Sequence, residues 1–286
     1  MTVNGSESGV TIDGTRSRYL AYDGPGSARL RYLEGGTGSP LVLLHTVRTQ
    51  AEHFQRLIPL LLPTHSVYAL DLPGMGYSDI EPGASYQEPA MRRAVERLID
   101  ELDLDDVTLV GESMGAVLAL TSAADLPDRV RRVIAVNPYD YAGGIARSSL
   151  LARVIISGIL APGVGPTFAG VEPKPVMRAI LRGGLVDPSA LTDEYVNELL
   201  AVGRRPGYST VARAVYGNLP SLIAARSLYP RVKVPVHVVY GDKDWSRPSD
   251  RHDNTRLLTD AEFLHIPDAG HFLSLERPDV IAALLN

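Results

Sequence analysis

The sequence predicts an α/β protein in which helices cover both faces of a mostly parallel central sheet, with a helical insertion late in the chain. Three observations predict this architecture. Short apolar runs typical of strands alternate with helix-like segments along most of the 286 residues, as in parallel sheets covered on both faces. A Gly-x-Ser-x-Gly sequence joins one such run to a helix-like segment. The strand signal then disappears between Tyr139 and Tyr229.

The expected strands open with an antiparallel hairpin and continue with buried runs rich in β-branched residues. In chain order they are 15–22, 29–33, 41–45, 66–70, 107–110, 130–136, 234–240 and 261–266. Helices are expected at 51–61 and 88–102, and the apolar stripe of the second has the helical spacing of core packing. The candidate catalytic residues all follow the carboxyl ends of strands, where ligand crevices open in parallel sheets.

The insertion is interpreted as a helical lid over residues 138–230, between core segments 1–137 and 231–286. Its helix-like runs are 146–160, 174–185, 192–202, 209–219 and 222–228, punctuated by prolines. Thr192 is the expected N-cap of one run, because Asp193 and Glu194 follow it in a first turn that favours acidic residues. Apolar side chains of the lid are expected to roof a largely apolar substrate pocket and to exclude water from it.

Ser113 is the candidate nucleophile. It is the central residue of Gly111-Glu112-Ser113-Met114-Gly115, which follows an apolar run and precedes an Ala/Leu-rich helix. Glycines on both sides allow a sharp strand-to-helix reversal that leaves the serine standing out of the bend. The backbone N–H of Met114, at the start of that helix, is expected to stabilise an oxyanion.

A serine hydroxyl needs a base to activate it and a third group to orient that base. His271 is the candidate base, since it lies in a loop just after the strand at 261–266. Asp244 is the candidate acid, at the end of the strand 234–240. Asp242 is an alternative that can instead shape the turn, and Asp140, after the preceding strand, is a third candidate.

The order Ser113, Asp244, His271 is the order of the α/β-hydrolase fold. With Leu43-Leu44-His45, the segment 71–78 (DLPGMGYS) and Gly270-His271, it makes the chain resemble the α/β-hydrolase superfamily over roughly 29–137 and 231–285. The resemblance is to the lid-bearing branch of esterases, lactonases, perhydrolases and carbon–carbon bond hydrolases. It implies Asp244 as the acid, three residues beyond the glycine. Related epoxide hydrolases and haloalkane dehalogenases use an aspartate where this chain has Ser113.

The sequence departs from that family after the third strand. Members usually carry His-Gly there, and the next backbone N–H forms the second half of the oxyanion hole, whereas this chain has His45-Thr46-Val47-Arg48. By position Val47 is the expected donor, although the branched side chain of Thr46 narrows the backbone range. His45 is interpreted as a turn-stabilising residue. Arg48 is either a substrate contact for a carboxylate or phosphate, or part of a structural ion pair.

Four residues are candidate substrate contacts: Thr46, Arg48, Tyr139 and Trp245. Trp245, the one tryptophan of the chain, follows the candidate acid. It is expected either to form a wall of the pocket or to support the Asp244 loop.

Composition limits the remaining function classes. With no cysteine, the chain has no disulfide, thiolate metal site or cysteine nucleophile, and it fits a reducing cytoplasm. The net charge of −5 and the lack of a basic stripe argue against nucleic-acid binding. Residues 1–9 lack the features of a secretory signal and are expected to form a tail, and no apolar stretch is long enough to span a membrane. We expect no metal or other cofactor, a small-molecule substrate, and a monomer or homodimer.

The favoured function is therefore a serine hydrolase that cleaves an ester, lactone or thioester of a largely apolar small molecule. The same three residues also suit a carbon–carbon bond hydrolase, a cyclase or an acyltransferase of a biosynthetic pathway. A third alternative is a ligand receptor in which the triad is vestigial.

Overall fold

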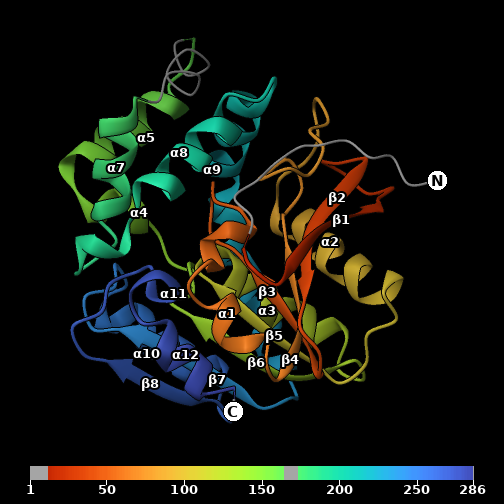
Figure 1. The fold of residues 1–286 in the computed structure, drawn as a ribbon. Coiled ribbons are helices and arrows are strands. Elements are labelled where there is room, and N and C mark those ends of the chain that lie inside the picture. The colour runs from red at the N-terminus through yellow and green to blue at the C-terminus, as the bar shows by residue number, and fades with distance from the viewer. Residues whose placement is uncertain (1–11, 164–172, 286) are drawn as a thin grey trace.

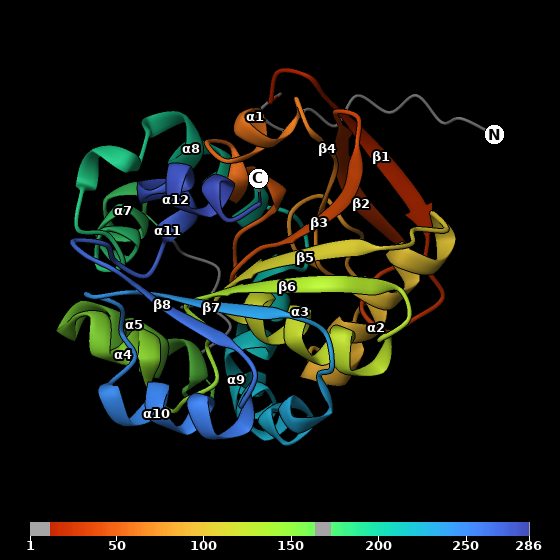
Figure 2. The same cartoon turned by 90° about the horizontal axis from the view of Figure 1, so that it is seen from below.

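The protein is described by a computed structural model over residues 12–163 and 173–285, so the expected tail at 1–9 lies outside the described residues. An eight-stranded sheet forms its centre, with helices on both faces (Figure 1 and Figure 2). This is the α/β-hydrolase fold that the sequence predicts.

The sheet has the strand order β1-β2-β4-β3-β5-β6-β7-β8. The strands β1 and β2 form the predicted antiparallel hairpin, β2 pairs antiparallel with β4, and the other neighbours are parallel. Their bounds are β1 (Thr15–Ala21), β2 (Arg29–Gly35), β3 (Ser39–Leu44), β4 (His65–Leu70), β5 (Val107–Glu112), β6 (Val130–Val136), β7 (Val236–Gly241) and β8 (Glu262–Ile266). Because β3 and β5 to β8 run in the same direction, their carboxyl ends meet at one edge.

Helices cover each face of the sheet and bury a separate apolar cluster. The core helices are η1 (Ala51–Phe54), α1 (Ile58–Leu61), α2 (Glu88–Glu101), α3 (Met114–Asp125), α10 (Pro248–Leu257), α11 (Leu273–Glu276) and α12 (Pro278–Ala283). Figure 2 shows α2, α3 and α10 on one face and α1 and α12 on the other. Leu98 and Val117 belong to the first cluster, and Ile58 and Ile281 to the second. Together the clusters fix the sheet whose edge carries the candidate site.

The described part of the segment between β6 and β7 consists of helices and the turns and loops that join them. Its helices are α4 (Gly144–Ser148), α5 (Leu150–Leu160), α7 (Lys174–Arg182), η2 (Pro188–Ala190), α8 (Asp193–Gly203), α9 (Tyr208–Ala225) and η3 (Arg226–Arg231). Figure 1 shows α4, α5, α7 and α8 gathered beyond the sheet. Thr192 is the N-cap of α8, as predicted, and its hydroxyl accepts the N–H of Tyr195.

Two predicted helices differ from the observed ones. The segment 51–61 is a 3₁₀ turn followed by a separate short helix, because Pro59 cannot donate the bond that would continue it and both Glu52 and His53 turn inward. The runs predicted at 209–219 and 222–228 are largely one helix, α9, which continues through Pro220. Its buried residues, among them Val215 and Leu222, pack on the first apolar cluster on both sides of the proline, which offsets the lost bond.

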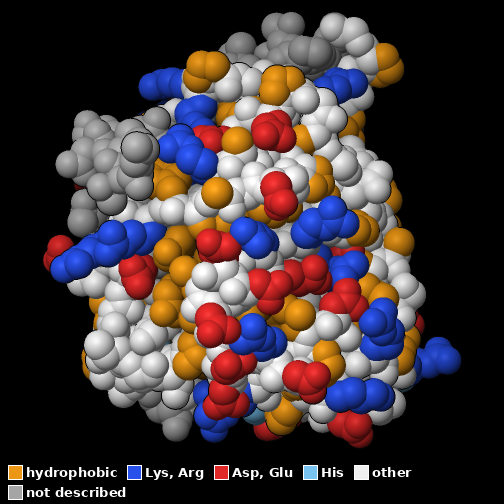
Figure 3. Space-filling view, turned by 90° about the vertical axis from the view of Figure 1, so that its right-hand side faces the viewer, with side chains coloured by type: hydrophobic (Ala, Val, Ile, Leu, Met, Phe, Trp, Pro, Cys, Tyr) orange, Lys and Arg blue, Asp and Glu red, His pale blue; other side chains and the backbone are white. Residues whose placement is uncertain are grey.

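The face seen in Figure 3 carries acidic and basic side chains interspersed with each other and with apolar ones, with no continuous basic stripe. None of the helices within 12–163 and 173–285 has both the length and the apolar character needed to cross a bilayer.

Candidate active site

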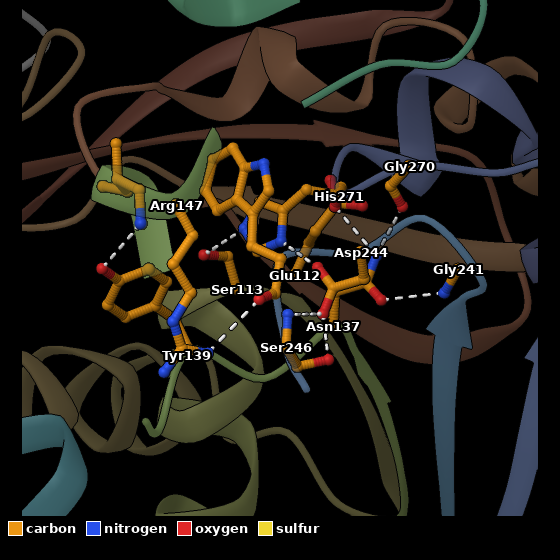
Figure 4. A network of polar contacts seen from close by, with 12 residues as sticks. Glu112, Ser113, Asn137, Tyr139, Arg147, Gly241, Asp244, Ser246, Gly270 and His271 are labelled. Atoms are coloured by element: carbon orange, nitrogen blue, oxygen red, sulfur yellow. Dashed lines mark hydrogen bonds and ion pairs between the residues drawn. The ribbon is translucent and has the colours of Figure 1, made fainter. Parts of the chain in front are cut away.

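Five adjacent strand ends carry the residues of the candidate site. The segments that follow β3, β5, β6, β7 and β8 hold Val47, Ser113, Asn137, Asp244 and His271, respectively. The strand pairings leave these ends nearly level, so the five segments converge. Figure 4 shows Ser113, Asn137, Asp244 and His271, from four of them, close together. Residues far apart in the chain thus meet at the carboxyl edge of the sheet.

Ser113 stands on a strained turn that only glycine neighbours permit. Its φ of 61° and ψ of −114° lie in a region that non-glycine residues rarely adopt. A Cβ on Gly111 would lie 2.1 Å from the carbonyl oxygen of Gly115, and a Cβ on Gly115 would lie 1.9 Å from that of Leu44. The predicted reversal between β5 and α3 is therefore present, with Ser113 at its apex.

The three candidate catalytic side chains form a continuous hydrogen-bonded series. The Oγ of Ser113 lies 2.9 Å from Nε2 of His271, and Nδ1 of His271 contacts Oδ1 of Asp244. With the ring proton on Nδ1, the serine hydroxyl donates to Nε2 and the ring donates to the carboxylate. Burial alone would raise the pKa of Asp244, but the charge of His271 and hydrogen bonds from His271 and Ser246 hold it below its ordinary value.

The other two candidate acids lie elsewhere. Asp242 accepts the N–H of Ala269 and pairs with Lys243, so it shapes the turn after β7. Asp140 is buried and accepts hydrogen bonds from Tyr229 and Asn254, both 2.9 Å long, on the side of α10. Burial raises the pKa of Asp140 to about 6. Of the three aspartates, Asp244 is the one placed against the base.

The segment 45–49 holds one peptide group in a fixed orientation. Leu72 N–H donates to Nε2 of His45, so the ring proton is on Nδ1, which donates to the carbonyl oxygen of Thr46 at 2.8 Å. The hydroxyl and the N–H of Thr49 donate to the same oxygen, at 3.0 and 3.3 Å. Because a trans peptide points its C=O and N–H in opposite directions, the N–H of Val47 faces away from these donors.

His45 itself is unsuited to a second catalytic role. Burial lowers its pKa to about 3, so the ring stays neutral, and both nitrogens are occupied by backbone groups. These contacts agree with a turn-stabilising role, as predicted from sequence. They also show how a chain without the usual glycine at Thr46 can fix the turn.

Asn137 holds the acid and base segments together, a role that sequence analysis missed. Its side-chain amide donates to the carbonyl oxygens of Gly270 and His271 at 3.0 and 2.9 Å, and its oxygen accepts the N–H of Gly241 at 2.9 Å (Figure 4). Its φ of 45° is one that asparagine tolerates better than most residues. An asparagine before a proline at a strand end was the available signal.

A second buried series links the inserted helical region to the turn that carries Ser113, and it too was missed. The hydroxyl of Tyr195 in α8 lies 2.9 Å from Nδ1 of His53, and Nε2 of His53 contacts the carboxyl group of Glu112, the residue before Ser113. Glu112 also accepts the N–H of Ser274, 3.0 Å away in α11. The series therefore connects α8, β5 and the helix that follows His271.

A narrow apolar cavity lies beside the triad. Its volume is about 40 Å³. Its lining residues are Thr46, Val47, Arg48, Thr49, Ile145, Met177, Ile180, Leu181, Leu199, Tyr216, Trp245 and Phe272. Of the predicted substrate contacts, Thr46, Arg48 and Trp245 line this cavity, whereas Tyr139 packs edge-on beside the ring of His271.

Within the described ranges, no group of three or more His, Asp or Glu side chains is arranged to hold a metal ion.

Comparisons with known proteins agree with this fold. Residues 41–284 match the model of the Alpha/beta hydrolase family. Haloalkane dehalogenase 2 of Mycobacterium tuberculosis (strain ATCC 25618 / H37Rv) is 25% identical over 273 residues, which cover 90% of each protein. Cis-3-alkyl-4-alkyloxetan-2-one decarboxylase of Shewanella oneidensis is 26% identical over 272 residues, 88% of this chain and 82% of its own.

A solved structure shows the same architecture. The crystal structure of wild-type Cfl2 from Burkholderia cenocepacia superposes with a TM-score of 0.82 at 25% identity, and the match covers 96% of both chains. The family match over most of the sequence and the shared fold confirm the resemblance inferred from the motifs. The chain belongs to the Alpha/beta hydrolase family, and it is a hydrolase of that fold.

Proposed function

We propose that this enzyme is a serine hydrolase that cleaves an ester, lactone or thioester of a largely apolar small molecule. The observation that carries the proposal is the series Ser113, His271, Asp244, whose bond from Oγ to Nε2 is 2.9 Å long. A hydroxyl within hydrogen-bond reach of an oriented imidazole is an activated nucleophile. The adjacent apolar cavity supplies a place for the substrate.

The proposed reaction has two halves. Oγ of Ser113 attacks the carbonyl carbon while Nε2 of His271 takes its proton, and the N–H groups of Met114 and Val47 stabilise the oxyanion. Collapse breaks the bond to the leaving group, which receives the proton from His271, and an acyl-enzyme remains. Water, deprotonated by the same imidazole, then attacks the acyl carbon and releases the acid and Ser113.

The nucleophile argues for a carbonyl substrate. The Mycobacterium relative is named a haloalkane dehalogenase, and attack by Ser113 on a halogen-bearing carbon would leave an ether. An ether has no carbonyl for water to attack, so the enzyme would not turn over. An acyl-enzyme has one, which is why a serine in this position favours acyl chemistry.

The cavity supports a compact apolar acyl group. The described lining is formed mainly by aliphatic and aromatic side chains from α7, α8 and the loops around the triad. The Shewanella relative is named for a reaction on an oxetan-2-one, a ring that contains an ester linkage, and this favours including lactones. Both Ser113 and His271 are fully buried, so a substrate reaches them only if the lid or side chains at the cavity end move aside.

Arg48 is proposed as a contact for a substrate carboxylate. It is the cation among the described lining residues, and it follows the proposed oxyanion donor. Its guanidinium carbon lies 5.6 Å from the ring centre of Tyr216 and 5.9 Å from that of Tyr208. Such cation–π contacts also suit a purely structural role, which the kinetic comparison in the Discussion distinguishes.

The proposal is tested with a fluorophosphonate probe and with 4-nitrophenyl esters of acetic, butanoic and octanoic acids. We expect labelling and turnover in the wild type, neither in Ser113→Ala, and faster turnover of the shorter acyl chains. Labelling without turnover of any ester, lactone or thioester would favour a carbon–carbon hydrolase, cyclase or acyltransferase. Absence of both labelling and turnover in the folded wild type would favour a receptor.

A further inference from the structure

The catalytic ring has an aromatic cover. The indole of Trp245 stacks on the imidazole of His271, with ring centres 3.7 Å apart and planes inclined by 15°. Tyr139 and Phe272 approach the same imidazole edge-on, at 6.4 and 5.3 Å. The two ring nitrogens are left to Ser113 and Asp244. The imidazole is therefore fixed in its plane by hydrogen bonds and against its face by Trp245.

The lid supplies the acceptor that holds this indole. Nε1–H of Trp245 donates to the carbonyl oxygen of Gly183 at 2.9 Å. The carbonyl oxygen of the next residue, Gly184, accepts the backbone N–H groups of His271 and Phe272 at 2.7 and 3.1 Å. Two successive lid carbonyls thus bind both partners of the stack.

A carboxyl group extends the same junction. Glu276 accepts the N–H groups of Val186 and Asp187 with one oxygen and the N–H of Gly270 with the other. The segment 183–187 of the lid is therefore bonded along the loop that carries His271. The junction is therefore formed by one backbone carbonyl group of Gly184 and one side-chain carboxylate of Glu276.

The close approach requires a glycine in the lid. A Cβ on Gly184 would lie 2.5 Å from Cε2 of Phe272 and 3.0 Å from Cζ2 of Trp245. Any larger residue there would push the lid away from the two rings. Gly217, in contrast, has open space, because a Cβ there would meet only Leu160, at 3.9 Å.

We propose that Trp245 is a positioning residue for His271. The Gly183–Gly184 turn of the lid holds the indole of Trp245 in place, so that the lid completes the catalytic site. Transfer of the Ser113 proton makes the imidazole cationic, and an indole face attracts a cation in a site shielded from water. The kinetic part of this inference rests on the proposed function. The stack and its dependence on the lid do not.

The stack can be measured directly, because Trp245 is the one tryptophan of the chain. A protonated imidazole quenches the emission of an indole stacked on it, so emission should fall as the pH is lowered through protonation of His271. The titratable groups that contact this ring are Asp244, whose pKa lies below its ordinary value, and Tyr139, whose pKa burial raises to about 12. Neither titrates between about pH 5 and 9. Arg147, which donates to the carbonyl oxygen of Trp245, pairs with Asp250. The titration is repeated in the Asp140→Asn background, because burial raises the pKa of Asp140 to about 6, within this range.

Three variants distinguish a positioning role of Trp245 from a role as a wall of the pocket. We expect Trp245→Leu to lower kcat about tenfold with KM within about threefold, and to move the acidic limb of the kcat/KM profile to lower pH, since the imidazolium loses its partner. Trp245→Phe, which keeps a ring but not the N–H, should recover part of kcat. Gly184→Ala should raise Trp245 emission and lower kcat, whereas the control Gly217→Ala should change neither.

The inference is overturned if Trp245→Leu raises KM but keeps the kcat and the pH profile of the wild type, because Trp245 would then be only a wall of the pocket. It is also overturned if the emission of a folded His271→Gln variant shows the same pH dependence as the wild type, or if Gly184→Ala behaves like Gly217→Ala. The emission experiments need no substrate. A protein that turns over no ester but shows the predicted quenching would therefore contradict the proposed function and keep the stack.

Discussion

Replacing Asp244 by asparagine tests the proposed triad through a single proton. In the wild type, Oδ1 faces Nδ1 of His271 and Oδ2 accepts the backbone N–H of Ser246 at 2.9 Å. A backbone N–H can only donate, so it selects the oxygen of the new amide and turns the NH₂ group toward His271. Two donors cannot meet, and the ring must carry its proton on Nε2. It then cannot accept the proton of Ser113.

The expected loss is large and specific. Forcing the wrong tautomer at a serine triad lowers kcat by about 10⁴, which corresponds to about 5.5 kcal/mol in activation free energy. The melting temperature should change little, because the amide keeps the shape of the carboxyl group and its bond to Ser246. The measurements are kcat for a 4-nitrophenyl ester, the rate of fluorophosphonate labelling, and thermal unfolding of the same preparation.

Asp140→Asn is the matched control, since Asp140 is also a buried aspartate at a strand end and is hydrogen-bonded to Tyr229 and Asn254 instead of His271. We expect its kcat to stay within about threefold of the wild type. A folded Asp244→Asn variant that kept kcat within about tenfold would refute the tautomer argument. A loss confined to Asp140→Asn would transfer the acid role to Asp140.

Four further outcomes are expected. Burial raises the pKa of Asp140 from 3.8 to about 6, so this residue binds its proton more tightly in the folded state than in the unfolded state. The stability of the wild type should therefore fall as the pH rises from about 4 through 6. Asp140→Asn should lack this fall and be up to about 3 kcal/mol more stable than the wild type at pH 8 in urea unfolding. Thr49→Val removes one donor from the peptide that carries the proposed oxyanion N–H, and should lower kcat about threefold to tenfold with KM unchanged; an unchanged kcat would exclude that support. Tyr195→Phe should lower kcat more than Tyr229→Phe, although each removes one buried hydroxyl and about 1 kcal/mol of stability; equal losses of kcat would show that the link to the nucleophile turn is only structural. Arg48→Ala should raise KM for carboxylate-bearing esters alone, and an equal rise for neutral esters would contradict the proposed contact.

The sequence predicts the fold because its signals are local and repeated. Strand-like runs alternate with helical stripes, and each central strand is buried on both faces, so hydrophobicity alone marks it. The predicted helix boundaries are wrong where polar side chains turn inward to reach buried partners. The single helix expected at 51–61 is instead a 3₁₀ turn and a separate short helix. Glu52 turns inward to pair with Arg31, and His53 turns inward to pair with Glu112. Pro59 lacks the N–H that would join the two parts into one helix.

The candidate triad is predictable for a different reason. Ser113, Asp244 and His271 are residue types with few common uses at strand ends, and each lies within three residues of a glycine in a recognisable turn. The signal at Asn137 is weaker, an asparagine before a proline at a strand end, although its side chain makes three hydrogen bonds to the segments that carry Asp244 and His271. The role of Gly184 could not be predicted from the sequence, because this residue contributes a backbone carbonyl oxygen and the lack of a side chain. The type of a residue does not reveal whether its backbone groups bond to a distant segment.

The inserted helical region is bonded to the segments that carry Ser113 and His271, and this has a consequence for the proposed substrate entry. One contact joins Gly183 and Gly184 to the stack on His271, and the other joins Tyr195, through His53, to the residue before Ser113. Since Ser113 and His271 are both fully buried, a substrate of the proposed reaction must displace part of the covering structure. If the displaced part is the 183–187 segment, the imidazole loses the face of Trp245 until the lid returns. The activated geometry would then exist only around an enclosed substrate, which is the condition under which a buried hydrogen bond to a developing charge is strongest.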